Sequence, residues 1–382
     1  MSDIKLLDAR GQGSITNSVH RSISTLFHCH FLAILLLTTF ITTVRAEIPV
    51  EPEKASGMHL GVVTCAGNTC HGANAPLKDS RVQQNEFIIW HREDKHAKAY
   101  TVLFNDASKR IARNLGIKAA HTEKLCLDCH ADNVPADRRG KRFQIDDGVG
   151  CEACHGGGEH YLGPHVSGTG THAENVKLGL YPAEEPKARA TLCLSCHLGD
   201  KDKLATHRIL GAGHPRISFE LDTFTHIQPM HFKIDKDYKE RKGNWNGMRI
   251  WAVGQLLTVE RFLELFQDPQ YQAAAAMRPL LAEIRNTVLR RQFTAADMRA
   301  MAGELVQAGM RGDGNDYGAA EQAAMALGAI TGALRTNGDL PPEKSARMED
   351  ALKEMDAVLK DEQGYDPDRM TKALKTVETL LR

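Results

Sequence analysis

The chain has no excess of charge of either sign, because its 48 Lys and Arg residues are matched by 48 Asp and Glu residues. Proteins that bind nucleic acid or an anionic lipid surface usually carry a basic excess. We therefore expect no nucleic-acid partner. The 382 residues leave room for two ordinary domains.

Long apolar runs are also lacking. The sustained run at residues 31–44 has about fourteen residues, which is too short for a comfortable membrane span. Arg21 precedes this run, and Val44-Arg45-Ala46 ends it with small residues that suit cleavage before Glu47. Residues 1–46 are therefore predicted to be the signal peptide of an exported, periplasmic protein. The alternative is an uncleaved anchor, in which case this segment would contact the membrane.

Cysteine is scarce outside one repeated pattern. Cys29 lies in the predicted signal peptide, and the other eight cysteines form four pairs, each followed at once by a histidine. No pair is left for a disulfide framework. The four motifs are Cys65-x4-Cys70-His71, Cys126-x2-Cys129-His130, Cys151-x2-Cys154-His155 and Cys193-x2-Cys196-His197.

This pattern is typical of covalent haem attachment. The paired thiols add across the two vinyl groups of a porphyrin as thioethers, and the adjacent imidazole becomes the proximal ligand of the iron. Four covalently attached haems c are therefore predicted. The first motif has a four-residue gap, so its loop must bulge to keep both sulfurs at the vinyl positions.

Zinc is the alternative cofactor for these thiols. Cys126, Cys129, Cys151 and Cys154 could close a tetrahedral four-thiolate site. A zinc site does not explain why a histidine follows each pair, so we favour haem. Because thioether attachment occurs outside the cytoplasm, haem also agrees with the predicted signal peptide.

Histidine and cysteine are both absent after His231, and this absence divides the chain. Residues 57–235 are predicted to be a tetrahaem cytochrome c domain with many loops and short helices, and residues 245–382 an α-helical domain. The fold class is therefore mostly α: a loop-rich multihaem cytochrome c domain followed by an α-helical bundle. Porphyrin faces supply much of the buried apolar surface in the first part, so it should not fold without haem.

Apolar residues at intervals of three and four indicate the helices of both parts. In the second part about five helices are expected, separated by turns at residues 311–314, 337–338 and 341–342, and Thr294 with Asp297 resembles a capping box. Methionines on these stripes are interpreted as core residues rather than haem ligands. The predicted stripes are Trp90, Ala97, Leu103, Phe104 and Ile111 between Phe87 and Leu115; Met277, Leu280, Leu281, Ile284, Val288 and Leu289; Met348, Leu352, Met355 and Leu359; and Met370, Leu374, Val377 and Leu381.

The ligand on the far face of each iron decides between electron transfer and catalysis. A second imidazole fills the remaining coordination position of the iron, and a methionine at that position raises the reduction potential. An empty position can bind small molecules. The predicted distal ligands are His96, His121, His165, His207 and His214, each of which lies beside small residues, a glycine-containing loop or a haem motif. The other histidines outside the motifs in the haem region have less support from their context: His59, His91, His160, His172, His226 and His231.

Three strings resemble those of the tetrahaem cytochrome c-554 family: Asp94-Lys95-His96-Ala97-Lys98-Ala99, Gly148-Val149-Gly150-Cys151-Glu152-Ala153-Cys154-His155-Gly156 and Gly163-Pro164-His165. The likeness covers roughly residues 60 to 200. Members of that family are periplasmic electron acceptors for hydroxylamine oxidoreductase. The resemblance implies that His165 lies opposite His71, that His96 lies opposite His155, and that the haem on His130 can lack a distal ligand.

The chain departs from this family in its longer first motif and its helical C-terminal half. The segment 206–221, which contains Gly211-Ala212-Gly213-His214-Pro215, instead looks like one found in other multihaem cytochromes. There it would supply a distal histidine, assigned here to His214 with His207 as the alternative.

The leading functional hypothesis is a periplasmic tetrahaem cytochrome that carries electrons between an oxidoreductase donor and a downstream carrier, either a cytochrome or a quinone-linked protein. Haem propionates make the holoprotein more acidic, which favours basic partners. The alternative is a haem enzyme acting on nitrite, nitric oxide or hydroxylamine at one iron with an open position. A third possibility is a docking protein whose helical half binds the partner.

Overall fold

The computed structural model describes residues 50–78, 80, 82–234, 238, 246–265, 278–310 and 316–382. These residues belong to one compact unit, Ile48–Arg382. The predicted signal peptide with Cys29, the Met277 position and the predicted turn at 311–314 lie outside the described residues. The predicted domain boundary between residues 235 and 245 lies outside them as well.

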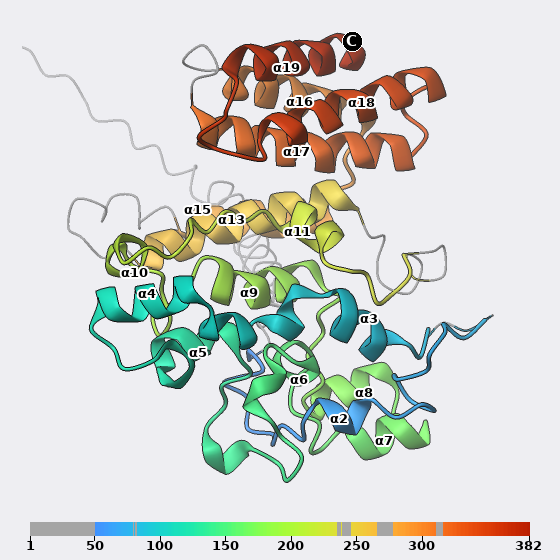
Figure 1. Cartoon of the computed structure of the whole chain (residues 1–382). Coiled ribbons are helices and arrows are strands. Elements are labelled where there is room, and N and C mark those ends of the chain that lie inside the picture. Colours follow the sequence, from blue (N-terminus) through green and yellow to red (C-terminus); the bar gives the residue numbers. More distant parts are fainter. Residues whose placement is uncertain are drawn as a thin grey trace, which may run out of the picture. The chain divides into compact units, whose positions relative to one another are not determined.

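The fold is mostly helical, as predicted, and the first part consists of short helices joined by loops (Figure 1). Within the described ranges no strand occurs, and His59 with Arg139 and Gly199 with Leu204 form isolated bridges. The helices are α2 Val62–Cys65, α3 Glu86–Glu93, α4 Asp106–Leu115, α5 Lys124–His130, α6 Cys151–His155, α7 Leu162–Ser167, α8 His172–Lys177, α9 Pro186–His197, α10 His207–Gly211 and α11 Leu221–Ile227. The 3-10 turns are η1 Lys95–Lys98, η2 Thr101–Phe104, η3 Ala120–Thr122, η4 Ala136–Arg138 and η5 Ile145–Asp147.

The predicted helical pieces between Phe87 and Leu115 are α3, η1, η2 and α4. The Asn105 side chain caps α4 by accepting from the Ser108 backbone N–H at 2.7 Å, and Gly116 ends the helix with a φ of 70°, a conformation that glycine adopts without strain. Trp90, Leu103 and Ile111 are buried as predicted. Phe104 is 44% exposed instead, because η2 is a separate 3-10 turn that does not continue the face of either neighbouring helix.

The second part contains longer helices with a core made entirely of side chains. Thr294 and Asp297 form the predicted capping box at the start of α16. The helices are α13 Gly247–Leu265, α15 Arg278–Arg290, α16 Ala295–Gly309, α17 Tyr317–Thr336, α18 Pro342–Val358 and α19 Pro367–Leu381. The shared core includes Met298, Leu327, Ile330, Leu334, Met348, Met355, Met370, Leu374, Val377 and Leu381.

These core residues confirm the predicted stripes of α18 and α19 and the interpretation of their methionines as core residues. The stripe of α15 is only partly covered, since Leu280 and Ile284 are exposed while Val288 and Leu289 pack against other apolar residues. Periodicity predicted that helix correctly, but which part of its face is covered depends on packing between distant segments.

Helix α13 connects the two parts of the chain. Ile250, Val253 and Leu257 of α13 form one buried cluster with Leu194 of α9 and Leu221 of α11. The fourth Cys-Cys-His motif lies on α9. The helix that carries this motif is therefore supported by a helix from the C-terminal half. No helix in the described ranges is both long enough and apolar enough to cross a membrane.

Candidate haem-binding site

Each of the four motifs lies on a short helical turn. Motifs two, three and four are on α5, α6 and α9, where a spacing of three residues brings both cysteines to one face. In the first motif α2 ends at Cys65, and the loop closes through hydrogen bonds from the His71 and Cys70 backbone N–H groups to the carbonyls of Cys65 and Gly67, 3.2 and 2.8 Å long. This loop is the bulge that the longer spacing predicts. All eight motif cysteines are partly exposed residues, and none of them forms a disulfide.

The imidazole ring of each motif histidine faces the ring of a histidine from a distant segment. The separations between ring centres fall within 0.2 Å of one another, although the four pairs lie in different local surroundings. The pairs are His71 with His165 at 6.1 Å, His197 with His96 at 6.2 Å, His155 with His231 at 6.2 Å and His130 with His214 at 6.3 Å.

This separation fits one metal ion between two imidazoles. An imidazole nitrogen lies about 2 Å from a bound transition-metal ion and about 1 Å from the centre of its own ring, so two rings on opposite sides of one ion have centres about 6 Å apart. The residues present therefore fit four haem irons, each with an imidazole on both faces.

Hydrogen bonds orient several of these rings through Nδ1. His71 Nδ1 lies 3.0 Å from Glu86 Oε2, and His130 Nδ1 lies 2.9 Å from the Ala99 carbonyl oxygen. When Nδ1 donates to an oxygen, the imidazole keeps Nε2 free as a ligand and its orientation is fixed. The distal rings of His96 and His214 are held in the same way, by Asp94 Oδ1 at 2.9 Å and the Pro215 carbonyl at 2.8 Å.

Two of the motif imidazoles are held in the neutral form that binds metal. Burial, with His231 nearby, lowers the pKa of His155 to about 4. Burial, with His96 nearby, lowers the pKa of His197 to about 4. Both rings are therefore neutral at ordinary pH and can offer a nitrogen lone pair.

The observed pairs differ in part from those that the family resemblance implies. His165 lies opposite His71, as the resemblance implies, but His96 lies opposite His197 rather than His155. His130, whose haem the resemblance allows to lack a distal ligand, faces His214. These pairings are corrected because they depend on how loops between the motifs fold back, which short sequence strings do not specify.

The other predicted distal candidates are not in these pairs. His121 stacks on Phe104 with ring centres 4.2 Å apart, and His207 begins α10 without facing a motif histidine. His231, which had little support from its sequence context, takes the place opposite His155. It follows Pro229 and Met230 in a segment with no local signal for a ligand, so only the tertiary structure identifies it.

The motifs themselves lie against one another in pairs that are not consecutive in sequence. The Cys65 thiol contacts that of Cys151, and the Cys129 thiol contacts that of Cys196. The hydrogen bond with the Cys129 thiol holds the pKa of Cys196 below its ordinary value. Thiolates are the reactive form of cysteine, so this arrangement favours reaction at Cys196.

These thiol contacts do not support the zinc alternative. The four cysteines that zinc would need are divided between two places, with Cys151 beside Cys65 and Cys129 beside Cys196. Among the described residues, the group with metal-ligand geometry is instead Glu51, Glu53 and Asp200.

A buried carboxylate connects the first and third motifs. Glu152, which lies between the two cysteines of the third motif, is 3% exposed. Its carboxylate accepts hydrogen bonds from the backbone N–H groups of Leu60, Gly61 and Gly158 at 2.7, 2.6 and 2.7 Å. Leu60 and Gly61 immediately precede α2, so Glu152 fixes the position of one attachment site relative to the other.

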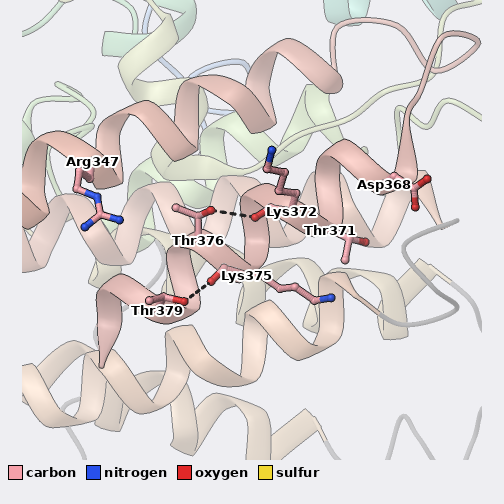
Figure 2. Close-up of a pocket in the computed structure, with 7 residues that line it drawn as sticks. All are labelled: Arg347, Asp368, Thr371, Lys372, Lys375, Thr376 and Thr379. Atoms are coloured by element: carbon pink, nitrogen blue, oxygen red, sulfur yellow. Dashed lines mark hydrogen bonds between the residues drawn. The ribbon is translucent and has the colours of Figure 1, made fainter.

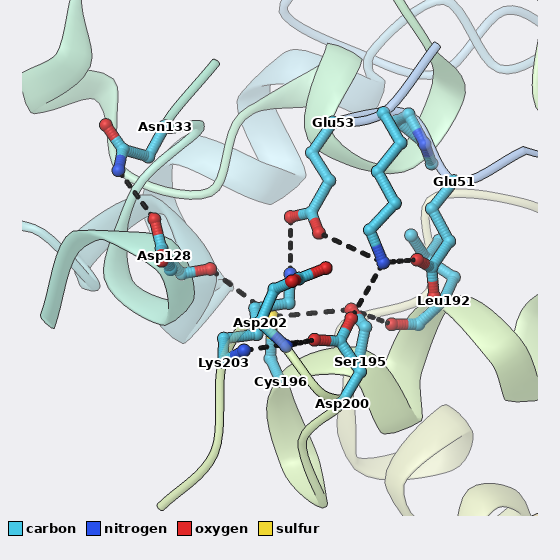
Figure 3. A network of polar contacts seen from close by, with 12 residues as sticks. Glu51, Glu53, Asp128, Asn133, Leu192, Ser195, Cys196, Asp200, Asp202 and Lys203 are labelled. Carbon is cyan, nitrogen blue, oxygen red and sulfur yellow. Dashed lines mark hydrogen bonds and ion pairs between the residues drawn. The ribbon is translucent and has the colours of Figure 1, made fainter. Parts of the chain in front are cut away.

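The acidic group of Glu51, Glu53 and Asp200 lies beside the fourth motif (Figure 3). Lys54 Nζ lies 2.5 Å from Glu51 Oε2 and 2.8 Å from Asp200 Oδ2, and Lys203 pairs with Glu53. These two lysines compensate the carboxylates without a metal ion. The network ties the N-terminal segment to the loop that follows Cys196 and His197.

A separate hollow of about 480 Å³ lies on the outer face of α18 and α19 (Figure 2). Its lining is polar and contains no cysteine or histidine. The lining residues are Arg347, Asp368, Thr371, Lys372, Lys375, Thr376 and Thr379. It is therefore not part of the haem-binding arrangement.

The motifs and the facing histidines, in a helical and loop-rich fold, form an arrangement typical of c-type cytochromes, the class of proteins that carry haem c. Residues 64–156 match the model of the family cytochrome c554 and c-prime, which confirms the resemblance seen in the sequence. The matched segment contains the first three motifs and His96, but not the fourth motif or the distal positions His165, His214 and His231. No curated protein and no solved structure matches the chain.

Proposed function

We propose that the protein is an exported tetrahaem cytochrome in which every iron has two histidine ligands and which transfers single electrons between partner proteins. The observation that carries this proposal is the set of four imidazole pairs at 6.1–6.3 Å. In the proposed ligand sets, His71 acts with His165, His130 with His214, His155 with His231 and His197 with His96. The motif cysteines form the thioethers.

Each haem, when bound, supplies an iron that alternates between the ferric and ferrous states by one electron. The histidine pairs keep both faces of the iron covered in either state, so little rearrangement accompanies transfer. Hydrogen bonds from Nδ1 hold the rings in place and limit their rotation.

The contacts between motifs support a particular order of the haems. Cys65 and Cys151 place the first motif beside the third, and the Cys196 thiol lies 3.8 Å from the Asp128 carbonyl of the second motif. Cys154 is close enough to Cys193 and Cys196 for their charges to affect its pKa. We infer that electrons pass along the order first, third, fourth and second, so that the haems on His71 and His130 are the ends of the chain.

The alternative is an enzyme that reduces or oxidises nitrite, nitric oxide or hydroxylamine. Such an enzyme needs an iron face to which its substrate can bind. A histidine facing each motif histidine argues against that reading and in favour of electron transfer.

Location and partners follow from the chemistry of attachment. Thioether formation outside the cytoplasm and the predicted signal peptide at residues 1–46 favour a periplasmic protein. The proposed donor is a periplasmic oxidoreductase and the proposed acceptor a cytochrome or quinone-linked protein. Haem propionates would favour partners with a basic docking surface.

The proposal is tested by counting the haems per chain and by measuring whether any haem iron has a free coordination position. Intact mass of the denatured holoprotein and a pyridine haemochrome assay should give four haems per chain, and the ferric spectrum by electron paramagnetic resonance should contain low-spin signals only. The ferrous wild-type protein should not bind carbon monoxide, whereas the His231→Ala variant should bind it at one haem in four. A wild-type protein that binds carbon monoxide, or one with fewer haems, would refute the proposal.

A further inference from the structure

The loop that carries His214 is attached to the helical C-terminal half by a carboxylate on α17. Arg216, two residues after His214, donates two hydrogen bonds of 3.0 Å to the two carboxylate oxygens of Glu321 on α17. The Ser218 hydroxyl donates a third, 2.6 Å long, to Glu321 Oε2. The Glu321 side chain is 15% exposed and that of Arg216 is 47% exposed, so the ion pair is partly open to water. The bond from Ser218 is the most enclosed of the three.

The surrounding side chains make this contact specific for arginine. The guanidinium group of Arg216 lies over the ring of Tyr317, 5.2 Å from its centre, and Tyr317 is one helical turn before Glu321. A planar guanidinium that pairs with a carboxylate through two bonds and stacks on an aromatic ring has one preferred orientation. Glu362 lies farther out, 3.7 Å from Arg216 Nε, and its side chain is 64% exposed.

The loop has supports on both sides of His214. On the N-terminal side, buried Ala212 packs on Ile111 and Leu115 of α4, and Asn114 donates a hydrogen bond of 2.9 Å to the Ala212 carbonyl. On the C-terminal side, the segment 215–219 makes no backbone-to-backbone hydrogen bond within the described part of the chain. Side chains therefore fix this segment, through Glu321 and through Phe219, which stacks on His197 with ring centres 4.5 Å apart.

We propose that Glu321 is a positioning residue for haem coordination: by binding Arg216 and Ser218 it holds His214 opposite His130 and so keeps the iron between them closed. This inference rests on the proposed ligand pair His130 and His214. The helical half would then influence ligand binding at the haem of the second motif. It begins more than a hundred residues after that motif. Without the carboxylate, the loop keeps its support on α4 but loses the contact that fixes its other end.

The test compares carbon monoxide binding by ferrous holoproteins. The wild-type protein should bind none, and His214→Ala should bind carbon monoxide at one haem in four. Glu321→Gln, which keeps the size of the side chain but loses its charge, should bind at up to one haem in four, and Arg216→Ala should behave similarly. The Glu349→Gln variant is the matched control, because Glu349 also forms ion pairs on the helical half, with Arg335 and Lys353, but does not touch the loop.

A double variant identifies the haem concerned. If Glu321 acts through His214, His214→Ala combined with Glu321→Gln should bind no more carbon monoxide than His214→Ala alone. If His214→Ala opens a haem but Glu321→Gln and Arg216→Ala leave all four closed, the inference about Glu321 is wrong while the proposed ligands stand. If His214→Ala opens no haem, the proposed ligand pair itself is wrong. Ferric low-spin signals that weaken in Glu321→Gln but not in Glu349→Gln would support the inference without any activity assay.

Discussion

The carboxylate of Glu152 shows how one side chain can set the distance between two cofactors. It lies within the third motif and accepts three backbone hydrogen bonds, two of them from the residues that precede the first motif. A buried carboxylate is stable only where donors surround it, and here the backbone supplies them. The cost of burying this charge is therefore offset by the same bonds that align the two attachment sites.

Replacing Glu152 with alanine should destabilise the holoprotein by about 3 kcal/mol, because three buried N–H groups lose their acceptor. The midpoint of urea unfolding, followed through the haem absorbance, measures this change. Glu159→Ala is a suitable control, since Glu159 accepts one partly exposed backbone hydrogen bond, from Met58. Equal effects of the two substitutions would contradict the role given to Glu152.

His59 is a fully buried histidine outside the proposed ligand pairs. Its Nδ1 lies 2.8 Å from Asp132 Oδ2. Burial alone would lower the pKa of His59, but the hydrogen bond and the charge of Asp132 outweigh it, so the pKa is raised above the ordinary value of 6.5. The protonated ring is therefore favoured in the folded protein.

This shift predicts a dependence of stability on pH. A group with a raised pKa in the folded state stabilises the protein fully below its unfolded pKa of about 6.5, and the stabilisation is lost as the pH rises through the folded pKa. The difference in unfolding free energy between wild type and His59→Gln should therefore be largest near about pH 6 and shrink toward pH 9 or so. Urea unfolding of both proteins across this range would test it, and a difference that grows with pH would contradict it.

Sequence alone identified the residues whose role is set by their immediate neighbours. Each motif cysteine and histidine was recognised because attachment requires them side by side, whereas a distal histidine needs no neighbour in sequence. His165 and His214 were proposed from local context, His231 was not, and His121 was proposed but lies on Phe104. The imidazoles that face one another come from segments up to about a hundred residues apart, so their pairing depends on the tertiary fold.

Helix α13 packs the helical half directly against the region that carries the Cys-Cys-His motifs. It buries Ile250, Val253 and Leu257 against the helix that carries the fourth motif. Arg261 on the same helix donates hydrogen bonds of 2.9 Å to Glu51 and 2.8 Å to the carbonyl of Thr191 on α9. Periodicity indicated about five helices in this half of the chain, but not that one of them would pack on the helix that carries the fourth motif.

Substituting Leu257 with alanine should lower the free energy of unfolding by about 3 kcal/mol, because the side chain is buried between α13 and α9. Val259→Ala is the matched control: Val259 is on the same helix but 44% exposed, so its loss should change stability by less than about 0.5 kcal/mol. Guanidinium unfolding monitored by circular dichroism would measure both. A similar small change in the two variants would show that α13 does not support α9.

The two halves of the molecule differ in how much apolar side-chain surface they bury. Among the described residues, the main core of the helical half contains twenty-one buried apolar residues, whereas the clusters that the first part forms by itself, around α4 and α5, contain five and three. The first part's other cluster, with Ala190, Leu194 and Leu221, is completed by α13. A part with so little buried side-chain surface cannot offset its loss of conformational entropy. In the proposed holoprotein the porphyrins supply the missing apolar surface.

A chain in which the eight motif cysteines are replaced by serine should therefore fold only in part. We expect α16–α19 to remain helical and resistant to protease, and residues 50–234 to be digested rapidly. Limited proteolysis with mass spectrometry of the fragments measures this difference, with the holoprotein as the control. Equal resistance of both halves would show that the first half has a sufficient core of its own.

The bond network of Glu152 and the contact between Cys129 and Cys196 also constrain how the molecule is made. The residues that precede the first motif are held by Glu152 of the third motif, and the second motif lies beside Cys196 of the fourth. The final surroundings of the first two motifs are therefore complete only when the third and fourth motifs have joined them.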